Sequence, residues 1–235
     1  ITLFPFSNKK SEAIFFMSEY LFERKEYKKV IDLLSQINLY QLNTENKDVA
    51  FFYLGYSCYK EHKYELAKNS FYEVVGSFNS KFREDAIFCN ANILLKEVNL
   101  TSALKEFQRL QESKTYTDKV PYYIAKILFD LNRYQDLVDY LDPVLDSSRS
   151  DNYIDLLLLQ AKSFFHLEKY DPAIAYFEDY KNLSGSLNQQ QLYQIGFAYY
   201  QKGLYGFAIN HLNKISILTN DTISQYAFYY LADSY

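Results

Sequence analysis

The side chains that most often carry catalysis or hold a metal are few in this chain. Its three histidines are His62, His166 and His211, and its two cysteines are Cys58 and Cys89. Zinc sites need these residue types at short, matched spacings, and the five residues here follow no such spacing. The sequence therefore predicts no metal ligand.

Other catalytic patterns point the same way. The acidic pairs Glu84-Asp85 and Glu178-Asp179 are expected at helix ends, where water solvates them. No glycine-rich phosphate loop, H-E-x-x-H or G-x-S-x-G motif occurs. Cys58 and Cys89 lie in apolar runs, which favours small buried hydrophobes over reactive thiols. We therefore predict no catalytic residue, no cofactor and no enzyme activity in this segment.

Composition limits the remaining function classes. Of the 235 residues, 49% are hydrophobic and 19% aromatic, which is too apolar for a disordered chain. The formal net charge of −4 offers no basic surface for nucleic acid, although aromatic stacking on nucleic acid or glycan stays an alternative. No run approaches 18 apolar residues, so no membrane insertion of this segment is expected.

A self-similar pattern organises the chain. One segment has a large residue, Leu-Gly and a Cys, followed by a Tyr, an Ala and a Phe. These residues are Phe51, Leu54-Gly55, Cys58, Tyr64, Ala67 and Phe71. This pattern resembles the tetratricopeptide repeat (TPR), a helix–turn–helix unit with a period of about 34 residues. It recurs with position 1 of each repeat near Ser11, Asp48, Glu84, Asp118, Ile154, Gln189 and Gln225.

Four positions of the repeat support this register. Position 8 is always small: Ser18, Gly55, Ala91, Ala125, Ala161, Gly196 and Ala232. Position 20 is mostly Ala: Val30, Ala67, Ala103, Leu137, Ala173 and Ala208. Position 17 is mostly Tyr: Tyr27, Tyr64, Leu100, Tyr134, Tyr170 and Tyr205. Position 24 is large and apolar: Leu34, Phe71, Phe107, Leu141, Phe177 and Leu212. A small residue at position 8 is expected where helix A and helix B cross closely.

The resemblance implies an all-α fold. We expect a right-handed superhelical solenoid of antiparallel helix pairs, with six full repeats and one further helix over residues 11–235. Residues 1–10 are expected to be an N-terminal linker or the end of a preceding element. The last helix has an apolar face with no following helix, so we expect a fragment of a longer chain. Related helical-hairpin repeats are the alternative fold.

In the TPR family, helix A lines the concave side of the array, and positions 2, 5, 9 and 12 face this groove. The resemblance therefore predicts a partner-binding groove of Phe52, Tyr56, Tyr59, Asn92, Tyr122, Lys126, Phe129, Lys162, Tyr193, Phe197 and Tyr200. Tyr suits such surfaces because its side chain has a large apolar ring, a hydroxyl group and few rotatable bonds to immobilise on binding. The alternative is that part of this aromatic stripe is core.

Three polar residues occupy position 9 in consecutive repeats: Asn92, Lys126 and Lys162. They could form a polar strip that receives a carboxylate. The alternative is that they are solvated side chains that keep the groove soluble.

The predicted function is a non-catalytic scaffold that binds a peptide or protein partner in the aromatic groove. The alternative is a structural spacer or self-assembling module whose rings are core or oligomer contacts, with self-association through the C-terminal helix. The Tyr-rich helices and irregular period resemble bacterial envelope arrays of the TolA-binding and outer-membrane-assembly type. This favours a periplasmic or envelope-associated protein over a cytoplasmic one.

Overall fold

The computed structural model describes residues 8–147, 152–215 and 222–235. Within these ranges the chain is all-helical, without a β-strand, as predicted. Residues 1–7 of the expected N-terminal segment lie outside the described residues, and Asn8–Lys10 form the first turn of α1. None of the described helices is long and apolar enough to cross a membrane.

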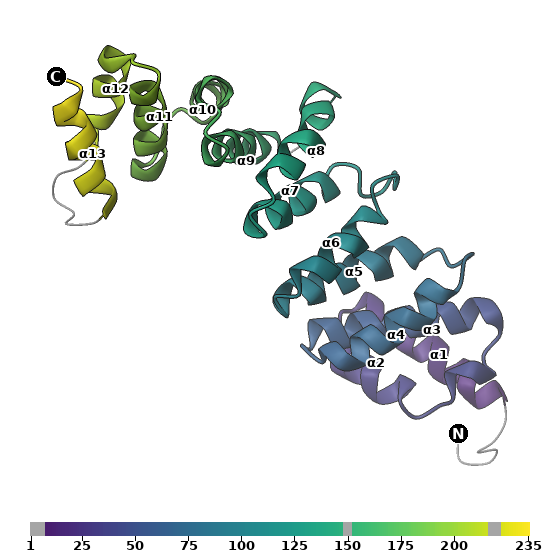
Figure 1. Ribbon diagram of the computed structural model, residues 1–235. Coiled ribbons are helices and arrows are strands. Elements are labelled where there is room, and N and C mark those ends of the chain that lie inside the picture. The colour runs from purple at the N-terminus through teal and green to yellow at the C-terminus, as the bar shows by residue number, and fades with distance from the viewer. Residues whose placement is uncertain (1–7, 148–151, 216–221) are drawn as a thin grey trace. The chain divides into compact units, whose positions relative to one another are not determined.

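The helices alternate as the repeat pattern predicts (Figure 1). Helix A of successive repeats is α1 (Asn8–Glu23), α3 (Thr44–Lys60), α5 (Arg83–Lys96), α7 (Val120–Asp130), α9 (Tyr153–His166), α11 (Gln189–Gln201) and α13 (Thr222–Asp233). Helix B is α2 (Tyr27–Leu34), α4 (Tyr64–Gly76), α6 (Leu100–Gln108), α8 (Tyr134–Ser147), α10 (Tyr170–Ser184) and α12 (Tyr205–Leu212). A short 3₁₀ turn, η1 (Leu39–Gln41), precedes α3.

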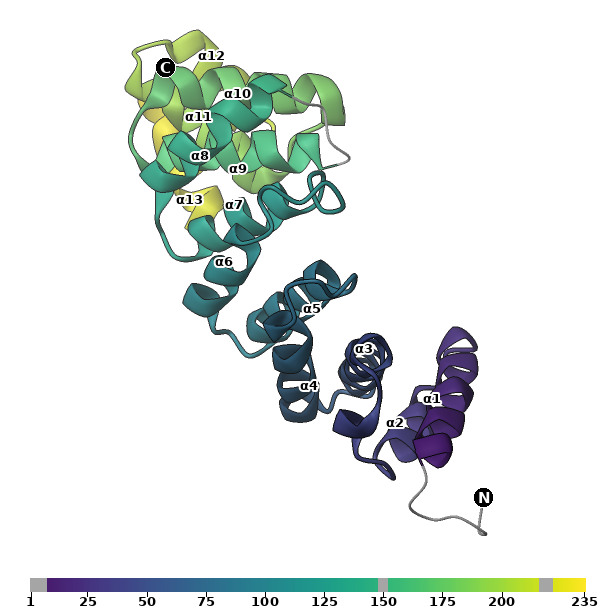
Figure 2. The same cartoon turned by 90° about the vertical axis from the view of Figure 1, so that its right-hand side faces the viewer.

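The chain forms two compact units, residues 1–117 and 118–235. In the first unit each helix A packs on its own helix B and on helix A of the next repeat, so α3 lies between α1 and α5 (Figure 2). The second unit repeats this arrangement, with contacts of α9 to α7 and α11 and of α11 to α13. Stacking of neighbours thus buries the apolar face that each hairpin exposes alone.

The core follows the repeat positions. All six residues at position 20 and all six at position 24 are buried, with exposed fractions of 0–1%. The small residues at position 8 are buried in the first six repeats. Ala232 is exposed, because the described residues contain no helix B of its own repeat.

The glycines at position 8 show why this site must be small. A Cβ atom built on Gly55 would lie 2.8 Å from the ring of Phe71, and one built on Gly196 would lie 2.7 Å from Leu212. Phe71 occupies position 24 of the repeat that contains Gly55, and Leu212 occupies position 24 of the repeat that contains Gly196. Position 8 is therefore limited by the large side chain at position 24.

The turn between helix A and helix B is built the same way in all six repeats. Position 15 has a left-handed backbone, with φ between +56° and +71°, in Lys25, His62, Val98, Asn132, Glu168 and Gly203. Its N–H bonds the carbonyl three residues back, and the next N–H bonds the carbonyl five residues back, as in Val98–Leu95 and Asn99–Leu94. This is the Schellman motif that closes helix C-termini.

Val98 is the residue least suited to this turn. Its φ is +58°, and the left-handed region is costly for a β-branched side chain. The side chain is 76% exposed, so little packing offsets this cost. We expect Val98→Gly to raise the free energy of unfolding by about 1 kcal/mol in chemical denaturation. The reciprocal change Gly203→Val should lower it by a similar amount, since Gly203 has the same geometry and open space around it.

Candidate partner-binding surface

The two cysteines are core residues, and the three histidines lie in different repeats. Cys58 and Cys89 are buried free thiols, as predicted. Burial raises the pKa of Cys58 to about 11 and that of Cys89 to about 12, so both stay protonated at neutral pH. No group of three or more His, Cys, Asp or Glu side chains that could hold a metal occurs in the described part of the chain.

The Schellman turn brings two rings together in most repeats. Helix A ends with an aromatic residue at position 12, and helix B begins with Tyr at position 17. Five of the six repeats contain this pair, with ring centroids 5.3–6.4 Å apart: Phe22–Tyr27, Tyr59–Tyr64, Phe129–Tyr134, Phe165–Tyr170 and Tyr200–Tyr205. We call these the turn pairs. Because the chain reverses at position 15 in every repeat, the same kind of ring pair recurs at five of the six turns.

In the first unit, rings from two repeats join into a strip. The ring of Tyr27 lies 5.9 Å from that of Tyr56 in the next repeat, and Tyr56 lies 6.3 Å from Tyr59. Tyr59 then pairs with Tyr64 across the turn. We call Tyr27, Tyr56, Tyr59 and Tyr64 the first aromatic strip. Its rings are all half-buried, which leaves part of each face open to a partner.

Two lysines lie on this strip. The Nζ atom of Lys60 is 5.2 Å from the Tyr56 ring centroid and 5.8 Å from that of Tyr59. Lys96, from the next repeat, lies 5.6 Å from Tyr59 and 5.8 Å from Tyr64. These are cation–π distances, and a hydrogen bond with the Tyr56 hydroxyl raises the pKa of Lys60. The first aromatic strip is therefore positively charged.

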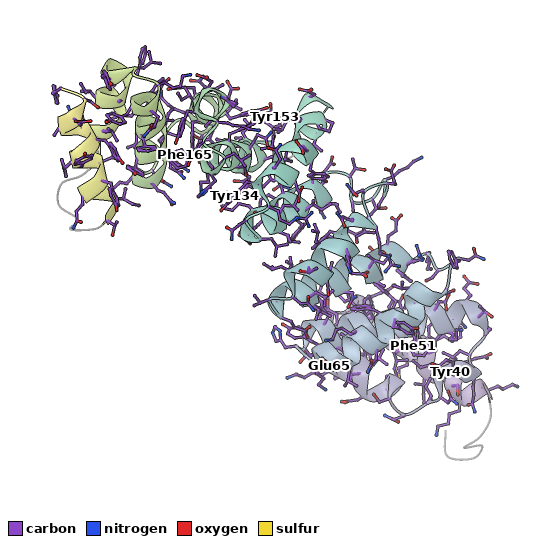
Figure 3. All side chains as sticks on the ribbon, in the orientation of Figure 1. Tyr40, Phe51, Glu65, Tyr134, Tyr153 and Phe165 are labelled. Atoms are coloured by element: carbon purple, nitrogen blue, oxygen red, sulfur yellow. The ribbon has the colours of Figure 1, made fainter. Side chains whose placement is uncertain are left out.

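In the second unit, ring contacts run from α7 to α13. Tyr134 stacks on His166 with centroids 4.5 Å apart and planes 7° apart, and Phe129 and Phe165 both contact the same histidine. Tyr134 and Phe165 can be followed in Figure 3. The contacts continue through Tyr170 and Phe197 to Tyr200 and Tyr230. We call this set the second aromatic strip: Phe129, Tyr134, Phe165, His166, Tyr170, Tyr193, Phe197, Tyr200 and Tyr230.

Phe197 lies at the centre of the second aromatic strip. Its ring contacts those of Phe165, Tyr170, Tyr193, Tyr200 and Tyr230. The Tyr200 hydroxyl donates a hydrogen bond to Asp233, which raises the pKa of Tyr200 to about 12. Burial raises the pKa of Tyr193 to about 12 as well. These hydroxyls therefore remain hydrogen-bond donors at neutral pH.

The structure places the predicted groove residues in different settings. Phe52 is only 6% exposed and stacks on Phe82 at 4.3 Å, so its ring is core and not an open surface. The Asn92 amide donates to the backbone carbonyl of its own helix at Phe88, over 2.8 Å. Tyr122 is half-buried. The remaining predicted rings, Tyr56, Tyr59, Phe129, Tyr193, Phe197 and Tyr200, belong to the two aromatic strips.

Position 17 is the part of the surface that the sequence interpretation missed. Its tyrosines served only to set the register, yet three of them bridge their own repeat to the next helix A. The ring contacts are Tyr27 with Tyr56, Tyr134 with His166, and Tyr170 with Phe197. The signal was present in the sequence, since position 17 is Tyr in five of six repeats.

The two lysines of the predicted polar strip in the second unit differ in environment. Lys126 is exposed and lies 3.6 Å from Asp130, one turn along its helix. Lys162 is half-buried, and no carboxylate of the described residues pairs with it. Burial lowers the pKa of Lys162, and the like charge of Lys126 lowers it further. Burial also lowers the pKa of His166, with a further contribution from Lys162.

The last helix carries exposed rings. Tyr226 is 53% exposed and Tyr229 is 64% exposed on α13. Together with Thr222, Gln225 and Tyr230 they line a shallow pocket of about 350 Å³.

Sequence comparison alone does not identify a relative. No protein-family model matches the chain, and no curated protein matches it significantly. Solved structures do resemble it. The C-terminal part of a TPR repeat-containing protein from Cytophaga hutchinsonii superposes with a TM-score of 0.65 at 15% identity, over 85% of this chain and 77% of that one.

Two further structures agree. A tetratricopeptide repeat protein from Parabacteroides merdae gives a TM-score of 0.61 at 14% identity, over 96% of this chain and 91% of that one. PilF from Pseudomonas aeruginosa gives 0.58 at 14% identity, over 94% and 97%. With the repeated turn and the buried positions 8, 20 and 24, these likenesses show that the chain has the tetratricopeptide-repeat fold.

Proposed function

We propose that this chain is a non-catalytic scaffold that binds a peptide segment of a protein partner on its aromatic strips. The observation that carries the proposal is the turn pair, repeated five times with rings that pack beside the core and stay half-buried or exposed. Rigid aromatic side chains with a polar tip are enriched at the centres of protein interfaces. The absence of catalytic motifs from the sequence supports a binding role over an enzymatic one.

Display selection tests this function with a random peptide library in place of the partner. The immobilised chain is used to select from random dodecapeptides, and the affinities of enriched peptides are measured by fluorescence anisotropy. We expect the variants Tyr56→Ala/Tyr59→Ala and Tyr134→Ala/Tyr200→Ala to weaken binding at least about tenfold, because ring truncation removes hot-spot contacts.

The control is Tyr72→Ala. Tyr72 is 78% exposed on α4 and belongs to neither aromatic strip, so its removal should leave the affinity unchanged. Thermal melting must show that the strip variants stay folded. The proposal fails if the wild-type chain enriches no peptide, or if the strip variants bind as tightly as the wild type.

A structural module that self-associates is the second candidate, and the exposed rings of α13 favour it. If Tyr226 and Tyr229 contact a second copy, sedimentation equilibrium will show a concentration-dependent dimer that the variant Tyr226→Ala/Tyr229→Ala abolishes. A wild-type monomer over the whole accessible concentration range argues against this candidate.

We further propose a bacterial envelope location, supported by the resemblance of the Tyr-rich repeats to envelope arrays. Cell fractionation with an antibody against the chain tests it. Recovery only in the cytoplasmic fraction would contradict it.

A further inference from the structure

Lys162 is half-buried and has no ion-pair partner among the described residues. It lies on α9, and the like charge of Lys126 on α7 acts on it. Other lysines of this unit pair on the surface: Lys181 with Glu178 at 2.7 Å and Lys202 with Asp171 at 2.8 Å. A cation that is half-buried without a partner loses part of its hydration, and an anion from a partner can restore that stabilisation.

The surroundings of Lys162 suit an acidic side chain flanked by apolar ones. Lys162 and Phe165 lie one turn apart on α9, as Lys126 and Phe129 do on α7, and these two helices pack together. The rings of Phe129, Phe165 and Tyr134 gather around His166. Two lysines thus lie one helical turn from rings of this cluster, on two helices that pack together.

We propose that Lys162, assisted by Lys126, binds a carboxylate of an acidic segment of the protein partner, whose apolar residues pack on the second aromatic strip. This inference rests on the proposed scaffold function and deepens it by naming the partner chemistry. A carboxylate beside Lys162 offsets the repulsion from Lys126, whose own partner Asp130 lies 3.6 Å away, and accepts charge-assisted hydrogen bonds from the Lys162 ammonium group.

The peptides enriched by display selection test the inference directly. We expect Asp or Glu beside aromatic or aliphatic residues to be over-represented among them. For an enriched peptide, replacing its acids with Gln or Asn should weaken binding to the wild type about tenfold. The same replacement should have little effect on binding to Lys162→Gln, because this variant lacks the ammonium group that binds the carboxylate.

Two further variants separate charge from structure. Lys162→Arg keeps the charge and should retain most of the affinity for the acidic peptide. Lys202→Gln removes a surface lysine of the same unit that is paired with Asp171, and should not change the affinity. A loss in Lys202→Gln equal to that in Lys162→Gln would show that only net charge matters, and would overturn the site.

A second readout is the imidazole of His166. Burial lowers the pKa of this histidine and the charge of Lys162 lowers it further, so a bound carboxylate that neutralises Lys162 should raise the pKa. Binding should therefore take up a proton and tighten as the pH falls from about 7.5 to about 6. The charged neighbour that acts on His166 is Lys162, and Lys126 acts on Lys162 in turn. The ring C–H signal of His166 in NMR titrations measures the shift.

Each outcome decides between the proposals. Enrichment of peptides without excess acids, or an unchanged pKa of His166 in the saturated complex, overturns the carboxylate site and leaves the scaffold function standing. Enrichment of no peptide at all overturns the scaffold function and this inference with it. If Lys162→Gln weakens the binding of the acidic peptide and of its Gln or Asn version by the same factor, the inference is overturned as well.

Discussion

Phe71→Ala is expected to lower the free energy of unfolding by about 3–5 kcal/mol, the largest effect that we predict for a single substitution. The ring is 1% exposed at position 24, where it fills the space between helix A and helix B of the second repeat. It also contacts Phe52, with centroids 6.3 Å apart. Its removal leaves a cavity that these helices cannot close without moving. Chemical denaturation followed by far-UV circular dichroism measures the loss.

The matched control lies seven residues further along. Phe78 has the same side chain and is 88% exposed, with Arg83 stacked 5.2 Å from its ring. We expect Phe78→Ala to change stability by no more than about 0.5 kcal/mol. If both substitutions lower the free energy of unfolding equally, position 24 is not the core position that the repeat register predicts.

Much of this core could be predicted from the sequence, because tight packing requires residues of similar size at the same position of each repeat. Position 20 is mostly small and position 24 large along the array, and Ala67 with Phe71 is one such pair. The structure buries them all. The small residue at position 8 was predicted from a close crossing of helix A and helix B, and the structure agrees. The atoms that meet a Cβ on Gly55 belong to Phe71 and Ser70 of helix B, and the structure adds that the position 24 side chain makes the closest contact.

The candidate surface was only partly predictable. Positions 9 and 12 came from the family resemblance, and the rings of Tyr56, Tyr59, Phe197 and Tyr200 lie in the aromatic strips. The burial of Phe52 depends on Phe82, which stands in a connection between repeats and has no repeat position. The repeat pattern therefore could not distinguish this core ring from a surface ring.

Two features of the surface depend on the path of the backbone and not on residue type. The turn pairs require the left-handed residue at position 15, which is Lys, His, Val, Asn, Glu or Gly in different repeats. No common residue type marks this conformation. Likewise, the sequence placed Lys126 and Lys162 at the same repeat position, but it could not show that Lys126 is exposed while Lys162 is half-buried.

Gly55→Leu is expected to cost about 3 kcal/mol, at the upper end for overpacking, because even its Cβ would lie 2.8 Å from the Phe71 ring. Gly76→Leu is the control within the same hairpin. Nothing lies within 4 Å of its Cβ position, so we expect no loss there and a small gain in helix propensity.

The combination of both substitutions tests the contact itself. In a Phe71→Ala background the Leu side chain at position 55 enters the space that the ring leaves. The double variant Gly55→Leu/Phe71→Ala should therefore be more stable than the sum of the single losses predicts, with a coupling of about 1–3 kcal/mol. Strict additivity would mean that the two positions do not touch. Since position 8 is small and position 24 large in each of the six hairpins, the same exchange at Gly196 and Leu212 should show coupling of the same sign.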